Sequence, residues 1–156
     1  MPQTPQLAFR FDSLQQEAYL ALWRTYDRLR TLEEELFDAF ELTAQQYNLL
    51  RLLASSSPHL VPTLSLVRRL VSRAPDVTRM LEQRRLIVRE RSEADRRAVL
   101  VGITKLGLAR LKQIARPLKD CHLQQLGHLT SSDLRELVRL LRKARTPHEP
   151  PDSPWS

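Results

Sequence analysis

The sequence predicts a mainly α-helical protein with one small β-hairpin. Two observations predict this fold class. Apolar residues recur at intervals of three or four along most of the 156-residue chain, which is the period of an amphipathic helix. Between residues 86 and 103, two β-branched segments of strand length flank a polar turn, which is typical of a hairpin. The chain length suits one domain with its own apolar core.

A long first helix is predicted over residues 13–40. Ser13 and Gln16 have the spacing of a capping box, which marks a helix start. One apolar stripe then follows the helix: Leu14, Ala18, Leu22, Tyr26, Leu29, Leu32, Leu36 and Phe40. Such a helix is about 40 Å long, hardly shorter than a domain of this size is wide. We therefore expect a second chain to cover part of the stripe; the alternative is that all of it packs within one subunit.

Residues 43–54 and 63–70 are predicted to form the next two helices. Thr43 opens the first of them with the same capping-box spacing, and the serines and proline of 55–58 end it. The second turns Leu66 toward the core and its two arginines toward solvent.

A fourth helix is predicted to begin after Ser72, with Pro75 in its first turn, where a missing N–H costs nothing. At about 100° per residue, Val77 and Leu81 share an apolar face with two neighbours, Ala74 and Met80. The opposite face is polar and small. Two short helices joined by a tight turn make a helix-turn-helix.

The hairpin is predicted to have strands at 86–91 and 97–103 around the polar residues 92–96. Guanidinium groups gather on it, from Arg89, Arg91, Arg96 and Arg97. A hairpin this small is not stable alone, so we expect it to lean on the preceding helices. Together they predict a winged helix-turn-helix over residues 43–103.

Two more helices are predicted after the hairpin. Thr104 opens one that runs to about Gly127 and is kinked at Pro117. Thr130 opens the last one, whose apolar face holds Leu134, Leu137, Val138 and Leu141. The proline-rich end of the chain, Trp155 included, is predicted to be disordered.

The sequence thus divides into an N-terminal arm (1–12), one domain (13–145) and a tail (146–156), and basic charge is concentrated within the domain. Residues 63–110 carry 12 basic and 5 acidic side chains, an excess of +7 that equals the net charge of the whole chain. Such a local excess is typical of a surface that binds a polyanion. The alternative is an ordinary solvated face rich in arginine.

The sequence lacks the residues that several classes of function require. Three glycines are too few for glycine-rich phosphate loops, and no Ser/His/Asp or Cys/His set has catalytic spacing, so we expect neither an enzyme nor a cofactor. The histidines and Cys121 lack the spacing of a zinc motif, so we expect no metal site. Cys121 is expected to be a small buried residue. One cysteine, no signal-like segment and no apolar run of about 18 residues predict a cytoplasmic protein.

The order of elements and three motifs resemble the MarR family of bacterial transcriptional regulators over about residues 12–145. These motifs are Leu42-Thr43, then Pro75-Asp76-Val77-Thr78-Arg79, and then Asp95-Arg96-Arg97 followed by Val99, Leu100, Val101, Ile103, Thr104 and Gly107. The resemblance implies a homodimer held by the helices in 13–40 and 104–145. It also implies a pseudo-palindromic operator, with the fourth helix in the major groove and a wing arginine in the minor groove.

The resemblance implies three groups of DNA contacts. The recognition helix supplies Arg73, Pro75, Asp76, Thr78 and Arg79. The wing supplies Arg91, Asp95, Arg96 and Arg97. The residues expected on the DNA backbone are Thr63, Ser65 and Arg69. Asp95 is expected to orient an arginine, because phosphates repel a carboxylate; the alternative is a turn residue that binds its own backbone.

The resemblance also implies a dimer interface and a ligand cleft. The interface is expected at Leu14, Ala18, Leu22, Leu134, Leu137, Val138 and Leu141. The family often binds small phenolic or other apolar molecules, for which the candidate lining is Trp23, Tyr26, Phe37, Phe40 and Tyr47; the alternative for these aromatic residues is plain core.

The chain departs from the family pattern where the recognition helix ends. Arg85 stands where the family usually has a glycine in a left-handed turn. We therefore expect about 1 kcal/mol of strain there, or a different helix end. The connection from Arg79 to Leu86 is also about three residues short, which should draw the wing toward the recognition helix.

The sequence therefore predicts a sequence-specific repressor of transcription that binds double-stranded DNA as a homodimer and is released by a small apolar or aromatic effector. One alternative is a helical module that binds a protein or an anionic surface through its first helix. Another is a protein that coats DNA without sequence preference.

Overall fold

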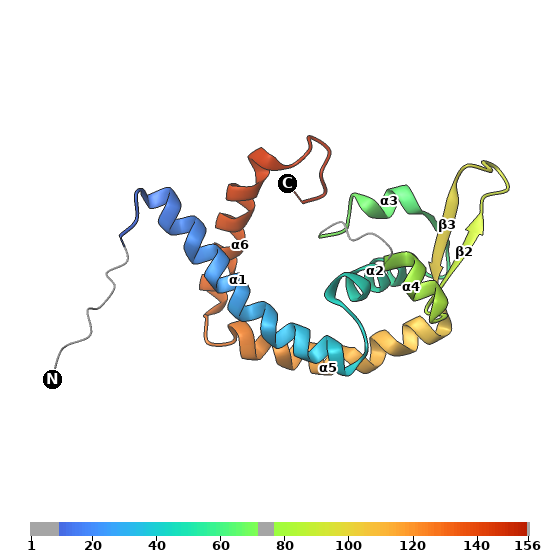
Figure 1. The fold of residues 1–156 in the computed structure, drawn as a ribbon, viewed down its shortest axis with the longest axis horizontal. Helices are drawn as coiled ribbons and strands as arrows, with labels where there is room; N and C mark the ends of the chain where they lie inside the picture. Colours follow the sequence, from blue (N-terminus) through green and yellow to red (C-terminus); the bar gives the residue numbers. More distant parts are fainter. Residues whose placement is uncertain (1–9, 72–76, 156) are drawn as a thin grey trace.

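A computed structural model describes residues 10–71 and 77–155. The long helices α1, α5 and α6 lie together, and the shorter helices and the strands form a second group at one end of α5 (Figure 1). The elements in chain order are α1 (Leu14–Ala39), α2 (Ala44–Ala54), β1 (Val61–Pro62), α3 (Thr63–Val67), α4 (Val77–Gln83), β2 (Ile87–Arg91), β3 (Val99–Ile103), α5 (Lys105–Leu126), α6 (Ser131–Arg145) and the 3-10 helix η1 (Thr146–His148).

The four predicted hydroxyl caps are confirmed. Each side-chain oxygen accepts the backbone N–H three residues further on, at Ser13, Thr43, Thr104 and Thr130. Thr43 and Thr130 complete the box, since the side chain of the third residue accepts the N–H of the cap. At Ser13 the Gln16 side chain accepts from Asp12 instead, at 2.8 Å. Local spacing therefore fixes where α1, α2, α5 and α6 begin.

Two helices end on a left-handed residue that is not glycine. Glu41 after α1 has φ 54°, and Arg85 after α4 has φ 59°. The following leucines donate their N–H groups back to carbonyls five residues earlier, to Phe37 and Leu81, both at 3.0 Å. These are Schellman ends, in which buried apolar residues meet across the last turn. The predicted departure at Arg85 is thus a strained left-handed residue and not a different helix end.

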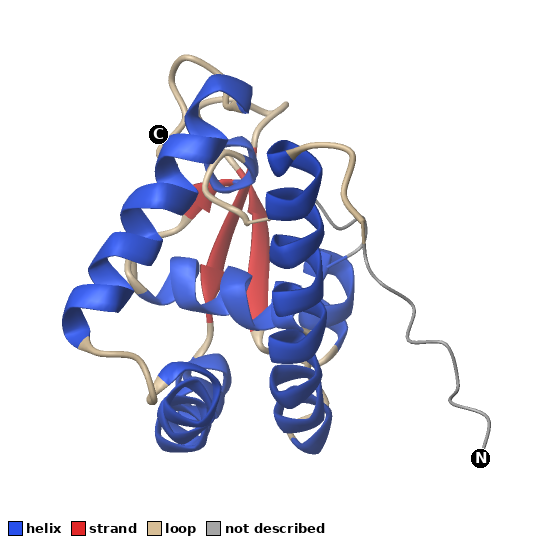
Figure 2. Ribbon diagram, turned by 90° about the vertical axis from the view of Figure 1, so that its left-hand side faces the viewer, coloured by secondary structure: helices blue, strands red, loops and turns tan. Residues whose placement is uncertain are grey.

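The strands form one small sheet in an otherwise helical molecule, in the order β1-β3-β2 (Figure 2). The predicted hairpin is confirmed: β2 and β3 are antiparallel, with Ile87 opposite Ile103 and Arg91 opposite Val99. The two-residue strand β1 was not predicted. α3 ends at Val67, three residues before the predicted end.

The apolar core lies in the group of short elements, between α2, α4, the sheet, the first half of α5 and the last turns of α1. Its fully buried members are Phe37, Leu49, Leu50, Leu53, Leu81, Leu86, Ile87, Val101 and Ile114. The N-terminal half of α1 takes no part in this core, and its large apolar side chains are exposed.

The end of the chain differs from the predicted disordered tail. Residues 146–155 fold back beyond α6 through η1 and two turns. The reason is that Arg145, at the end of α6, donates to the carbonyl of Trp155 at 2.7 Å and lies over its ring. Proline-rich composition favours disorder, but it does not report a contact of this kind.

Candidate nucleic-acid interface

The tip of the wing is a closed turn. Ser92 donates its N–H to the carbonyl of Ala98 at 3.0 Å, and the Ala98 N–H reaches the carbonyl of Asp95 at 2.9 Å. Arg91, Arg96 and Arg97 are exposed around this turn. Among the residues that the structure describes, none of the three forms an ion pair with a carboxylate. Their charges are therefore available to an external anion.

Asp95 acts on the backbone and not on a guanidinium. Its Oδ1 accepts the N–H of Arg97 at 3.0 Å, and its own N–H donates to Ser92 Oγ at 3.2 Å. The expected pairing with an arginine side chain is replaced by the turn geometry that aspartate favours. Asp95 thus fixes the backbone from which the Arg97 side chain extends.

Of the expected recognition helix, the structure describes α4. Thr78 is half-buried and Arg79 is exposed. Leu81 is buried, as predicted, but Met80 is 52% exposed. The other expected contacts of this helix, Arg73, Pro75 and Asp76, lie outside the described residues.

The residues expected to contact the DNA backbone divide into two kinds. The Thr63 hydroxyl donates to the carbonyl of Val99 at 3.0 Å, which ties α3 to β3, and the Ser65 hydroxyl donates to the carbonyl of Pro62 at 2.7 Å. Neither hydroxyl proton is free for a phosphate while these bonds hold. Arg69 is exposed and is the member of this group best suited to a phosphate.

The wing is joined to the recognition helix. Arg89 Nη1 on β2 lies 3.5 Å from Glu82 Oε2 on α4. Three residues, 84–86, connect the end of α4 to the start of β2. The Arg89 charge, unlike those at the tip, is partly used inside the protein.

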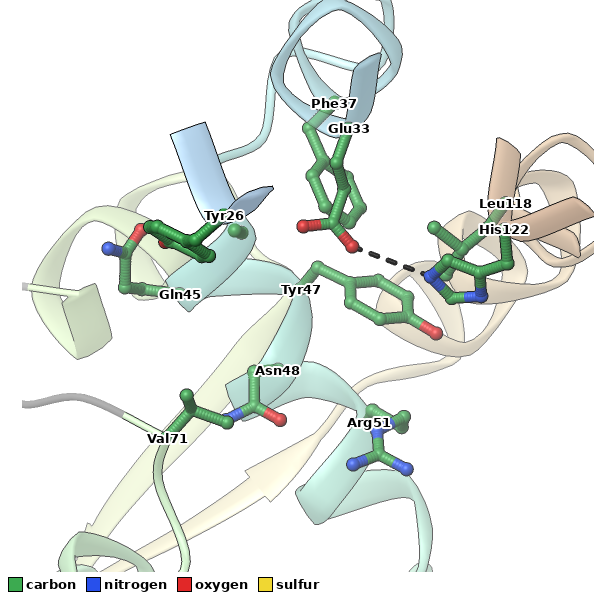
Figure 3. A pocket seen from close by; sticks show the side chains of 11 residues that line it. Tyr26, Glu33, Phe37, Gln45, Tyr47, Asn48, Arg51, Val71, Leu118 and His122 are labelled. Carbon is green, nitrogen blue, oxygen red and sulfur yellow. Dashed lines mark ion pairs between the residues drawn. The ribbon is translucent and has the colours of Figure 1, made fainter. Parts of the chain in front are cut away.

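A cavity of about 470 Å³ lies where α1 and α5 meet α2 (Figure 3). Three of the five aromatic residues expected at a ligand cleft line it: Tyr26, Phe37 and Tyr47. The other two do not. Phe40 packs against the core, and Trp23 is exposed beside a separate surface hollow near Phe11.

Polar groups in this cavity were missed by the sequence analysis. His122 Nε2 on α5 lies 3.5 Å from Glu33 Oε1 on α1, and Arg51 of α2 also faces the cavity. Burial raises the pKa of Tyr47, with a smaller opposing effect from Arg51. Glu33 lies seven residues after Tyr26 and four before Phe37, on the same side of α1, which is the one signal in the sequence that pointed to it.

Four of the seven expected dimer residues are exposed in the single chain, and the other three are half-buried. Leu14 is 77% exposed and Leu22 is 47% exposed. Ala18 is also exposed. On α6, Val138 is exposed, while Leu134, Leu137 and Leu141 are half-buried. An apolar surface of this extent on one helix is typical of an interface.

Cys121 is buried, and burial together with the negative charge of Glu33 raises the pKa of its thiol. Within residues 10–71 and 77–155, no three His, Cys, Asp or Glu side chains are placed to hold a metal ion. None of the described helices is long and apolar enough to cross a bilayer.

No family model matches the chain, and no curated protein does. Among solved structures, the chain is similar to a MarR transcription factor from Planctomyces limnophilus, with 52% identity over 85% of this chain and 98% of that one, at a TM-score of 0.66.

Two more distant structures share the fold. One is Sco3205, a MarR family transcriptional regulator from Streptomyces coelicolor solved in complex with DNA, with 23% identity over 96% and 99% of the two chains and a TM-score of 0.74. The other is BpsR from Bordetella bronchiseptica, whose DNA binding is regulated by 6-hydroxynicotinic acid, with 24% identity over 82% and 98% and a TM-score of 0.73. Because the Planctomyces protein is identical at about half of the aligned positions across nearly its whole length, this chain belongs to the MarR family of transcription factors.

Proposed function

We propose that the chain is a homodimeric repressor that binds a pseudo-palindromic operator and releases it when a small effector binds. The observation that carries this proposal is the cluster of exposed arginines at the wing tip, Arg91, Arg96 and Arg97, none of which pairs with a carboxylate among the described residues. In this proposal the protein acts by occupying promoter DNA in the bacterial cytoplasm, and it catalyses no reaction.

DNA recognition combines two kinds of contact. Thr78 and Arg79 on α4 face the major groove, where a guanidinium pairs with the edge of guanine through two hydrogen bonds. Arg96 and Arg97 at the wing tip reach the minor groove, whose negative potential is strongest where it is narrow. Arg69 and Arg91 add contacts to phosphates, which position the protein without selecting sequence.

The effector site is the cavity between α1, α2 and α5. Tyr26, Phe37 and Tyr47 offer aromatic walls, while Arg51 and His122 offer donors. This lining, which also contains the Glu33 carboxylate beside His122, suits a small aromatic molecule that carries a polar group. The cavity lies between the helices that would form the dimer and the elements that would bind DNA (Figure 3), so a ligand there can change the angle between the two parts.

The test is a gel-shift titration with the DNA just upstream of the protein's own coding region, against a scrambled duplex of the same composition. A specific regulator binds the first at least about a thousandfold more tightly, and the affinity falls steeply with salt. Equal affinity for both duplexes would instead support a DNA-coating protein. Failure to bind either duplex at low salt would remove the proposal in favour of an interaction module.

A further inference from the structure

The segment that follows α6 returns to the part of the molecule that carries the DNA-binding elements. In Figure 1 the C-terminal end lies between α6 and α3. η1 and the turns after it carry the chain from the end of α6 to the side of α3, where Asp152 and Trp155 lie beside residues of α3 and of the turn after it.

The returning segment is held in a defined shape by its own contacts. Arg145 Nε lies 3.3 Å from Glu149 Oε1, in addition to its bond to the Trp155 carbonyl at 2.7 Å. The Ser153 hydroxyl donates to Glu149 Oε2 at 2.7 Å and accepts the N–H of Trp155 at 3.1 Å. Glu149 and Trp155 are half-buried. These bonds fix where Asp152, in the turn between them, presents its carboxylate.

The Asp152 carboxylate contacts the DNA-binding part through one arginine side chain, that of Arg68. Asp152 forms an ion pair with Nη1 of Arg68, which directly follows α3. A hollow of about 410 Å³ lies beside the pair, with Val67 and Val71 on one wall and Trp155 on the other. The side chains of Arg68 and Asp152 are 69% and 60% exposed, so water and other ions reach the pair and it exchanges easily.

Arg68 lies within the basic segment 63–110 and next to Arg69, the expected backbone contact best suited to a phosphate. A guanidinium that is paired with a carboxylate binds a phosphate oxygen less tightly, because the carboxylate engages part of its donors and offsets its charge. We propose that the C-terminal segment is an acidic counter-ligand: Asp152 occupies Arg68 in the free protein and must be displaced before Arg68 binds a DNA phosphate. This inference rests on the proposed function.

The test is a double-mutant cycle on DNA binding at several salt concentrations, with Asp152→Asn, Arg68→Ala and the double variant of the full chain. The probe is a fluorescein-labelled duplex of mixed sequence, followed by anisotropy, because competition for a phosphate does not depend on sequence. Removing the carboxylate should tighten binding about two- to fivefold at low salt. It should also make the slope of log affinity against log salt steeper by up to about 0.9, the value of one more phosphate contact. In the Arg68→Ala background, Asp152→Asn should change neither quantity.

Glu136→Gln is the matched control. It removes the same charge from a carboxylate whose one ion pair among the described residues is with Arg139 on α6, at 2.7 Å, so it reports the effect of net charge alone. Equal effects of Asp152→Asn and Glu136→Gln would overturn the inference, as would a gain that persists without Arg68. If the parent protein binds no duplex even at low salt, the proposed function fails instead, so the two failures are distinguishable.

Discussion

Gly107, in the first turn of α5, is a residue whose side chain has no room. A Cβ there would lie 2.3 Å from the backbone oxygen of Leu86 and 2.6 Å from Cγ1 of Ile103. The Leu86 oxygen is held in place because it accepts the N–H of Thr104 at 3.1 Å, and the Thr104 hydroxyl donates to the neighbouring carbonyl of Arg85 at 2.8 Å. The glycine of the wing motif is therefore a packing requirement at the point where α5 passes the end of α4.

We expect Gly107→Ala to lower the free energy of unfolding by about 1–3 kcal/mol, the usual cost of forcing a methyl group into a packed site. Urea denaturation measures it. Gly102→Ala is the comparison, since its Cβ would meet Cδ2 of Leu60 at the flexible end of a side chain, and we expect a loss below about 1 kcal/mol. Equal losses for the two variants would contradict the role given to the Leu86 carbonyl.

Arg85 carries backbone strain that glycine would relieve. Its φ of 59° lies in the left-handed region, where a Cβ costs about 1–2 kcal/mol, part of which glycine returns through its freer unfolded chain. We expect Arg85→Gly to raise the free energy of unfolding by about 0.5–1 kcal/mol in thermal or urea melts. Gln83→Gly, two residues earlier within α4, should lower it by a similar amount. Loss of stability in both variants would mean that Arg85 contributes contacts that outweigh its strain.

Among the elements, the wing should contribute most to DNA affinity for its size. We expect Arg97→Ala to weaken specific binding by about 1–3 kcal/mol in a filter-binding titration, because the Asp95 turn holds its backbone at the tip and the described structure gives its charge no carboxylate partner. Arg116→Ala, an exposed arginine on α5, removes the same charge far along the chain from the wing. Unchanged affinity in Arg97→Ala, or an equal loss in both variants, would count against this role for the wing.

Elements that are specified locally could be predicted, and those specified by a distant partner could not. The caps at Thr43 and Thr130 need only a residue three positions away, and the hairpin strands are adjacent in sequence. β1 exists because Val61 pairs with Val101, which no local pattern reveals in two residues that include a proline. The same limit applies to the candidate site: the partners of Thr63 and Asp152 lie 36 and 84 residues away.

At the scale of the whole molecule, burial is one-sided. The buried core lies among the elements proposed to bind DNA, while the first turns of α1 expose Leu14, Tyr19, Leu22 and Trp23. The length of the helix predicted this, because a stripe of about 40 Å is too long for one small domain to cover. Which parts of the stripe are left open depends on where α5 and α6 pack, and their apolar faces alone do not give that position.

The exposed stripe leads to the prediction that the protein is a dimer and that Leu22→Asp separates it. A carboxylate placed in an apolar interface, once from each subunit, should raise the dimer dissociation constant at least about a hundredfold. Light scattering over a dilution series measures this, and binding to a two-half-site operator should weaken in parallel. Thr31→Asp is the control, since Thr31 is exposed and lies about 180° around α1 from Leu22. A parent protein that is monomeric at all concentrations, or a Leu22→Asp variant that dimerises as tightly as Thr31→Asp, would contradict an interface built on this face of α1.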